Sequence, residues 1–454
     1  AYGNLLVAVC FLPALLWVGL TRFHGITAYG FAVGTLVLFL ALNLGGPTYH
    51  NLDIAMYYNR WCWAVSGLIF ATIMLEGPER RSAHVLDGLL IGLCLSFLAL
   101  TKVTFFLFLA LPVLGGLLIF RRFLALFTSV LAGCAVLLGI YLVTGGPEFM
   151  LAYIEDLKSV SLSGARTVPS LGLLPMMVAP EFVVGNVALI AAGIALRRAG
   201  FMREGLFLLL LVPGIFLVVV QNWGNYLQWS LALGVILYAV VWQERARRRT
   251  AAIRTSALII CAFALPQVMT MGFSLINHWT MQPEKYVAVL TDPRFSDLKF
   301  ARIRQAVTTL KTERKYGYED QYLGRFKLPE GGSFRGEELP KCDMRTALPS
   351  QIRAIADDLA AREDTRGKRI LSASNSSNYW MFGGTERLRD GSIWYYGGEH
   401  GFDDADFLVI PFCTYGTQGE NSRQTILDLI EADDRYDFTE VDRNDLFILL
   451  KRNR

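Results

Sequence analysis

The sequence predicts a polytopic α-helical membrane protein with about ten spans and a C-terminal exported α/β domain. Hydrophobic residues make up 53% of the 454 residues. Apolar runs of about 20 residues, the length that crosses a hydrocarbon core of roughly 30 Å, are confined to residues 1–280, whereas residues 285–454 have the composition of a soluble protein. We therefore expect a transmembrane helical domain (1–280), an irregular linker or subdomain (281–348) and an α/β domain (349–454).

The candidate spans follow one another with short polar connections between most of them. They lie at residues 4–20, 28–43, 58–76, 84–100, 103–120, 123–144, 181–196, 205–220, 227–242 and 255–276. The runs 84–100 and 103–120 are separated only by Thr101 and Lys102. They form either two spans or a broken, re-entrant hairpin.

The charges of the connections predict the orientation of these spans. Alternate connections are rich in arginine, through Arg22, Arg80, Arg81, Arg121, Arg122, Arg197, Arg198, Arg203, Arg245, Arg247, Arg248, Arg249 and Arg254. The positive-inside rule places this set in the cytoplasm. The connections that are poor in basic residues, with everything after residue 277, then face the other side. A chain that starts outside implies either a removed signal peptide or a preceding helix and external loop.

Two regions outside the spans have patterns of their own. In 145–180, apolar residues recur at helical spacing against acidic ones, which predicts a helix lying on the membrane surface. In the α/β domain, Ser350 can cap a helix that runs to about 363. A second helix is expected at about 422–433. Strands are expected at 369–374, 406–412, 436–441 and 446–451, the last two as a hairpin.

The stretch 45–63 is the most polar interruption between two spans. It holds His50, Asp53 and Arg60. Asp53 and His50 at an outer membrane face could serve as a general base or hold a divalent cation, or they could be solvated loop residues. Arg60 could bind an anionic ligand or extend to a lipid phosphate. The tyrosines and tryptophans of this stretch fit an interfacial aromatic belt better than sugar stacking.

Two further external turns carry candidate ligand-binding residues. Lys102 is the single lysine or arginine in an apolar hairpin, so a phosphate group is its natural partner, with ordinary lipid headgroups as the alternative. The turn QNWGNY offers Asn222, Asn225 and Tyr226, which suit either sugar hydroxyls or a short interfacial loop. In the α/β domain, a polar segment at 375–378 with nearby aromatic residues suits either a carbohydrate-binding rim or a turn.

The sequence also excludes several function classes. No spacing of cysteines and histidines indicates a metal site. No nucleotide-binding, metalloprotease or serine-hydrolase motif occurs in the required context, and there is no nucleic-acid footprint. Whether Cys342 and Cys413 pair is open.

Several of these features together resemble the GT-C superfamily of integral-membrane glycosyltransferases, in its aminoarabinose and protein O-mannosyl transferase-like branch. The ALTK segment ending at Lys102 is similar to an element whose lysine lies toward the phosphate of a polyprenyl-phosphate sugar. The segments YWMFGG, GSIWYYGG, DADFLVIPF and DLFILLKR resemble exported domains of bacterial members. The resemblance implies a protein of the bacterial inner membrane with its C-terminal domain in the periplasm.

One feature departs from that superfamily. Its members carry an essential carboxylate in the first external loop, whereas this sequence begins where that loop would already have passed. We expect that one helix and that loop precede Ala1, which makes Asp53 a secondary site residue. Otherwise the protein is a relative that has lost catalysis.

Two hypotheses of different classes follow. In the first, the protein transfers a sugar from a polyprenyl-phosphate donor to an acceptor on the periplasmic face. Lys102 and Arg60 hold the phosphate, Asn222, Asn225 and Tyr226 contact the donor, and Asp53 and His50 assist the acceptor or a divalent cation. In the second, it is a non-catalytic subunit that packs into a larger membrane complex. A transporter is less favoured, because the spans show no inward-facing charge or paired broken helices.

Overall fold

The computed structural model describes residues 2–42, 57–162, 180–221, 227–243, 250–313, 332–340, 348–391, 394–395 and 397–453. The chain divides into two compact units. The first comprises Ala1–Pro147 and Pro169–Met281, and the second comprises Glu148–Val168 and Gln282–Arg454. Each unit is described by itself.

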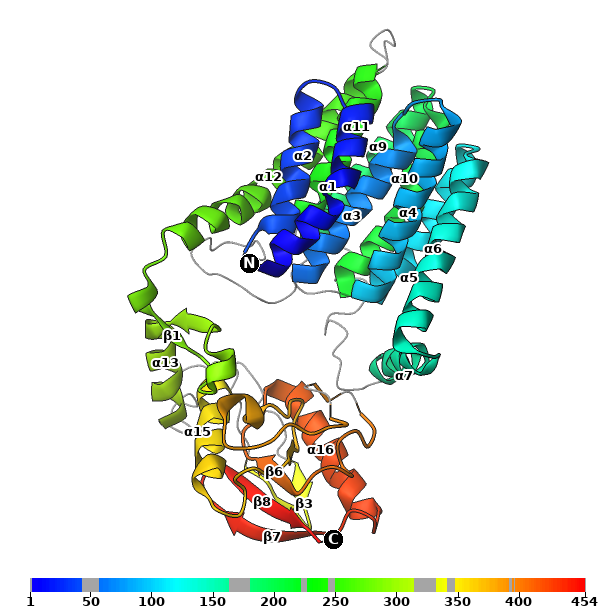
Figure 1. Ribbon diagram of the computed structural model, residues 1–454. Coiled ribbons are helices and arrows are strands. Elements are labelled where there is room, and N and C mark those ends of the chain that lie inside the picture. The colour runs from blue at the N-terminus through cyan, green and yellow to red at the C-terminus, as the bar shows by residue number, and fades with distance from the viewer. Residues whose placement is uncertain are drawn as a thin grey trace. The chain divides into compact units, whose positions relative to one another are not determined.

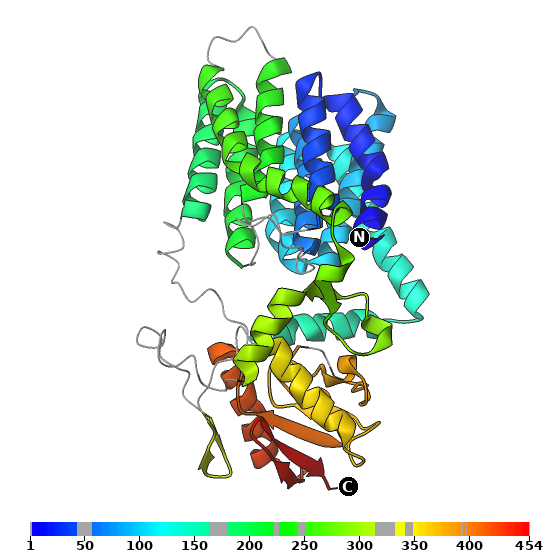
Figure 2. The same ribbon diagram turned by 90° about the vertical axis from the view of Figure 1, so that its left-hand side faces the viewer.

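The first unit is a bundle of long helices that lie side by side (Figures 1 and 2). Its elements are α1 (Tyr2–Arg22), α2 (Ile26–Leu40), α3 (Tyr57–Met74), α4 (Arg81–Thr101), α5 (Val103–Ile119), α6 (Phe123–Thr144), α9 (Pro180–Arg198), α10 (Met202–Gln221), η1 (Leu227–Trp229), α11 (Ser230–Gln243) and α12 (Ala251–Trp279). Each predicted apolar run coincides with one of these helices.

Five helices in the described part of the chain are long and apolar enough to cross a membrane. They are Tyr2–Arg22, Arg81–Thr101, Phe123–Thr144, Met202–Val220 and Ala251–Ile276, and shorter apolar helices lie at Ile26–Leu40, Val103–Ile119 and Leu227–Trp242. The lipid-facing pattern is clearest in α6, where Phe123, Phe127 and Leu142 are each more than half exposed. The protein is therefore a multi-pass membrane protein.

Helices α4 and α5 are two continuous helices that meet at Lys102. Lys102, which separates them, lies beside Tyr58 at the start of α3. At the far end of α5, Arg122 donates hydrogen bonds to the carbonyls of Thr72 and Leu75 at the end of α3. Since α5 connects the two ends of α3, the pair is a hairpin of two complete helices.

Small residues bring α4 and α6 into close contact. A Cβ built on Gly88 would lie 2.4 Å from the carbonyl oxygen of Ala125, and one built on Gly92 would lie 2.3 Å from that of Ser129. The two glycines are four residues apart and share one helix face, the small-xxx-small arrangement that lets membrane helices pack backbone to backbone. This contact fixes α6, whose other faces are largely exposed.

The second unit contains a four-stranded mixed sheet with helices on both faces. Its elements are α7 (Glu148–Leu162), η2 (Pro283–Lys285), β1 (Tyr286–Ala288), η3 (Pro293–Phe295), β2 (Lys299–Ala301), α13 (Arg302–Glu313), β3 (Ser333–Phe334), β4 (Glu337–Glu338), α15 (Leu348–Ala361), β5 (Ile370–Ser372), η5 (Tyr379–Phe382), β6 (Phe407–Pro411), α16 (Gly416–Ala432), β7 (Phe438–Arg443) and β8 (Phe447–Arg452). The order is β5-β6-β8-β7, with β5 parallel to β6 and the other pairs antiparallel.

Apolar side chains point alternately to the two faces of the sheet and so contribute to two cores. Leu408 and Ile410 on β6 pack with Ile426 and Leu427 of α16 on one face. Phe407 and Val409 point to the opposite face, where α15 contributes Ile355 and Leu359, among others. Successive strand residues point to opposite faces, so both helices are held by one set of strands. The strands and helices expected in 349–454 form at the expected places.

One part of the second unit differs from the expectations, and another follows one of the two alternatives that the sequence left open. The region 281–348 was expected to be irregular, yet its described residues include the β1–β2 hairpin and α13. The signal for α13 was the spacing of Ile303, Ala306, Val307 and Leu310. The polar segment 375–378 serves as a turn: the amide of Tyr395 donates to the carbonyl of Asn375, and Ser377 Oγ accepts from the amide of Ser372.

Candidate functional site

The end of α2 gathers polar groups from α1, α3 and α12. The last carbonyls of a helix have no partner within it, and here side chains supply the donors. The hydrogen bonds run from Trp61 Nε1 to Phe39 O (3.2 Å), from Asn4 Nδ2 to Ala41 O (3.0 Å) and from Tyr57 Oη to Leu42 O (2.9 Å). The amide of Leu42 in turn donates to Ser274 Oγ at 2.9 Å. All of these ends were predicted to share the non-cytoplasmic face.

Arg60 belongs to this cluster and is fully buried. Its Nη2 donates to the carbonyl of Ala41, and its guanidinium carbon lies 4.6 Å from the centre of the Tyr57 ring. A cation at the carbonyl end of α2 is stabilised by the helix dipole. Arg60 therefore closes α2 from within the bundle, away from the surface where a lipid headgroup or a solvent-exposed ligand would lie.

An aromatic cluster lies at the same end, one turn further into α3. The ring of Trp63 stacks on that of Trp229 with centroids 5.2 Å apart, and it meets Phe105 edge to face at 4.8 Å. A Cβ on Gly185 would lie 3.1 Å from Trp229, so the start of α9 adjoins this cluster. Elements from four distant parts of the sequence thus converge there.

Lys102 lies at this end of the bundle, between α4 and α5. Its backbone is extended (φ −153°, ψ 91°), and it ends the first helix and begins the second. Its Nζ lies 5.0 Å from the centre of the Tyr58 ring. This cation–π contact holds the ammonium group at the bundle end, beside the first turn of α3.

Two buried polar atoms in or beside the aromatic cluster of Trp63, Phe105 and Trp229 have no hydrogen-bond partner among the described residues. They are the hydroxyl of Thr104, two residues after Lys102, and the indole nitrogen of Trp229. Burying such a group without a partner costs about 1–3 kcal/mol. Both can donate a proton, as a lysine ammonium does. Donors of this kind grouped at an apolar helix end suit the oxygens of an anion such as a phosphate.

The remaining predicted site residues lie outside the described residues. These are His50, Asp53, Asn222, Asn225 and Tyr226. The structure therefore brings together Lys102 and Arg60 at one end of the bundle and gives them different surroundings. Within the described part of the chain, no group of three or more histidine, cysteine or acidic side chains could hold a metal ion.

At the opposite end of the bundle, a buried ion pair was missed by the sequence reasoning. Arg22 Nη2 lies 2.5 Å from Asp87 Oδ1, with side-chain exposures of 0% and 5%. Trp17 Nε1 also donates to this carboxylate, at 2.9 Å. The expectation that no inward-facing charge occurs within the spans is therefore wrong at Asp87. The signal was an aspartate inside an apolar run, close in the sequence to an arginine-rich loop.

Comparison with models of protein families, with curated proteins and with solved structures finds no match for this chain. Its function is therefore inferred from the residues and their geometry.

Proposed function

We propose that this protein is a membrane glycosyltransferase that moves a sugar from a polyprenyl-phosphate donor to an acceptor on the periplasmic face of a bacterial inner membrane. The observation that carries the proposal is the position of Lys102. It is a cation at a helix junction in an apolar hairpin, with the buried donors of Thr104 and Trp229 close in the fold.

The membrane orientation is part of the same proposal, with about ten helices crossing the bilayer. The arginine-poor connections, including Lys102, then face the periplasm. Cys413 in the second unit is disulfide-bonded, whereas Cys10, Cys62, Cys94, Cys134 and Cys261 are free. Disulfides persist in oxidising compartments, which supports an exported second unit.

The chemistry follows from the charges involved. An acceptor hydroxyl attacks the anomeric carbon, the bond from that carbon to the phosphate oxygen breaks, and the electron pair leaves with polyprenyl phosphate. Lys102 stabilises the charge that develops on the leaving phosphate. A general base takes the proton of the acceptor, and Asp53 or His50 assists this step or holds a divalent cation there. Arg60 is assigned a positioning role, because it closes α2 from a buried location.

The proposal is tested by a transfer assay with the full chain in nanodiscs and a panel of polyprenyl-phosphate hexoses. Lys102→Ala should lower turnover by about 10²–10³-fold, the usual effect of removing one charge-stabilising donor. Lys102→Arg should retain part of it. The matched control is Lys158→Ala, on the exposed face of α7. Wild-type turnover in Lys102→Ala would exclude the phosphate role.

The non-catalytic alternative predicts a different result. The wild-type protein would then transfer no sugar and would co-purify in a stoichiometric complex without any bound lipid-linked sugar. The same preparation therefore separates the two hypotheses.

A further inference from the structure

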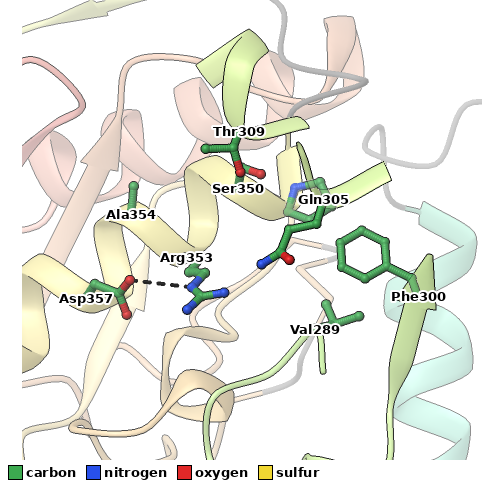
Figure 3. Close-up of a pocket in the computed structure, with 9 residues that line it drawn as sticks. Val289, Phe300, Gln305, Thr309, Ser350, Arg353, Ala354 and Asp357 are labelled. Atoms are coloured by element: carbon green, nitrogen blue, oxygen red, sulfur yellow. Dashed lines mark ion pairs between the residues drawn. The ribbon is translucent and has the colours of Figure 1, made fainter. Parts of the chain in front are cut away.

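The second unit contains a pocket of about 390 Å³ between the β1–β2 hairpin and helices α13 and α15 (Figure 3). This volume lies within the roughly 300–1,000 Å³ of small-molecule sites. The residues that line it include Val289, Phe300, Gln305, Ser350, Arg353 and Asp357. None of these residues takes part in the site at the end of the helical bundle.

Helical spacing places the lining residues on two facing surfaces. Ser350, Arg353 and Asp357 recur at intervals of three and four residues, so they share one face of α15. Gln305 and Thr309, which also lines the pocket, are four residues apart and share one face of α13. The two helices are joined where Ser350 Oγ donates to Thr308 Oγ1 at 2.7 Å. The polar surface is therefore built by regular secondary structure.

The polar groups of the pocket offer both donors and acceptors. Arg353 Nε lies 3.6 Å from Asp357 Oδ2. Figure 3 shows the Asp357 carboxylate directed toward Arg353, while Gln305 and the Phe300 ring lie on the other side of Arg353. The groups that meet a ligand there are an amide, a guanidinium, a carboxylate and hydroxyls.

We propose that this pocket binds a neutral sugar residue. The charges of Arg353 and Asp357 offset each other, so an anionic ligand meets the carboxylate and a cationic ligand meets the guanidinium. A neutral polyol both donates to Asp357 and accepts from Arg353, and Gln305 can do either. The ring of Phe300, with Val289, supplies an apolar wall for the C–H face of a sugar.

The proposal does not rest on the proposed function, because it concerns free sugars and needs no lipid-linked donor. Failure of the transfer assay would leave it intact. Failure of sugar binding here would likewise leave the role of Lys102 intact.

The test uses the full chain in nanodiscs and saturation-transfer-difference NMR. The probes are the methyl glycosides of glucose, mannose, galactose and N-acetylglucosamine, with glucuronate and glucosamine as charged comparisons. At least one neutral glycoside should bind with a dissociation constant on the order of 1 mM. Asp357→Ala and Arg353→Ala should each weaken that binding about tenfold, the loss expected for one charged hydrogen-bond partner.

Glu363→Ala is the matched control, since this exposed carboxylate lies beyond the end of α15 and outside the pocket. It should bind as the wild type does. Both Asp357 and Glu363 are exposed, so neither substitution disturbs a core. The proposal is overturned if no neutral glycoside gives a saturable signal. It is also overturned if Asp357→Ala binds as Glu363→Ala does, or if glucuronate or glucosamine binds more tightly than every neutral glycoside.

Discussion

Replacing Asp87 by asparagine should destabilise the helical unit by about 3–5 kcal/mol, because it removes one partner of a buried ion pair. The pair is closed to solvent, with Arg22 at 0% exposure and Asp87 at 5%, and its atoms are 2.5 Å apart. The amide oxygen of the introduced asparagine would still accept the hydrogen bond of Trp17. The loss is therefore the cost of a buried guanidinium that no longer faces a carboxylate.

The assay is equilibrium unfolding of the full chain by SDS in mixed micelles, followed by tryptophan fluorescence. Asp156→Asn on the exposed surface of α7 is the matched control and should change stability by less than about 0.5 kcal/mol. The double variant Arg22→Met with Asp87→Leu should recover most of the loss, since apolar replacement of a whole buried pair is often neutral.

Two results would refute this reasoning. One is an Asp87→Asn protein within about 1 kcal/mol of the wild type, which would mean that the pair is hydrated in the membrane. The other is a double variant as unstable as the single one, which would place the loss in packing and not in charge.

Three further predictions concern packing and pH. Gly92→Ala should lower the free energy of unfolding by about 1–3 kcal/mol, because its Cβ would lie 2.3 Å from a carbonyl oxygen of α6. The same SDS assay measures this loss. Gly139→Ala, which adds a Cβ in open space, should leave the stability unchanged. Burial raises the pKa of Tyr379 to about 12, so its contribution to stability is fully present below the ordinary value near 10 and is lost as pH rises toward 12. Tyr379→Phe should flatten that alkaline decline in melting temperature, and an unchanged slope would exclude Tyr379 as its source. The Arg443 side chain holds the pKa of Glu440 below its ordinary value, so Glu440 contributes stability above about pH 4.5 that is lost on further acidification. Glu440→Gln should therefore weaken the decline of the melting temperature at acid pH. A decline as steep as that of the wild type would contradict this role of Glu440.

The helices of the first unit could be predicted because each is a long apolar run between polar turns. The alternating arginines also grouped the helix ends correctly: Tyr58 meets Lys102, and Arg122 meets the far end of α3. The same holds for the strands after residue 369, whose β-branched and aromatic residues are bounded by turns.

The environments of individual polar residues could not be predicted, since they depend on distant segments. The sequence around Arg60 does not distinguish an arginine that faces lipid from one that closes α2, and only the placement of Ala41 in the fold decides between the two. Asp87 meets a partner 65 residues away in the sequence. The pocket between α13 and α15 requires two helices and a hairpin to come together, and no local pattern encodes that contact.

The proposed function depends above all on Lys102 binding the phosphate of a polyprenyl lipid. The most direct test is native mass spectrometry of the full chain with polyprenyl phosphate, in competition with excess phosphatidylglycerol. We expect the wild type and Lys158→Ala to retain polyprenyl phosphate, and Lys102→Ala to bind it about 10- to 100-fold more weakly, the range for a hydrogen bond to a charged group. Equal retention by Lys102→Ala, or displacement by phosphatidylglycerol from the wild type, would contradict the claim.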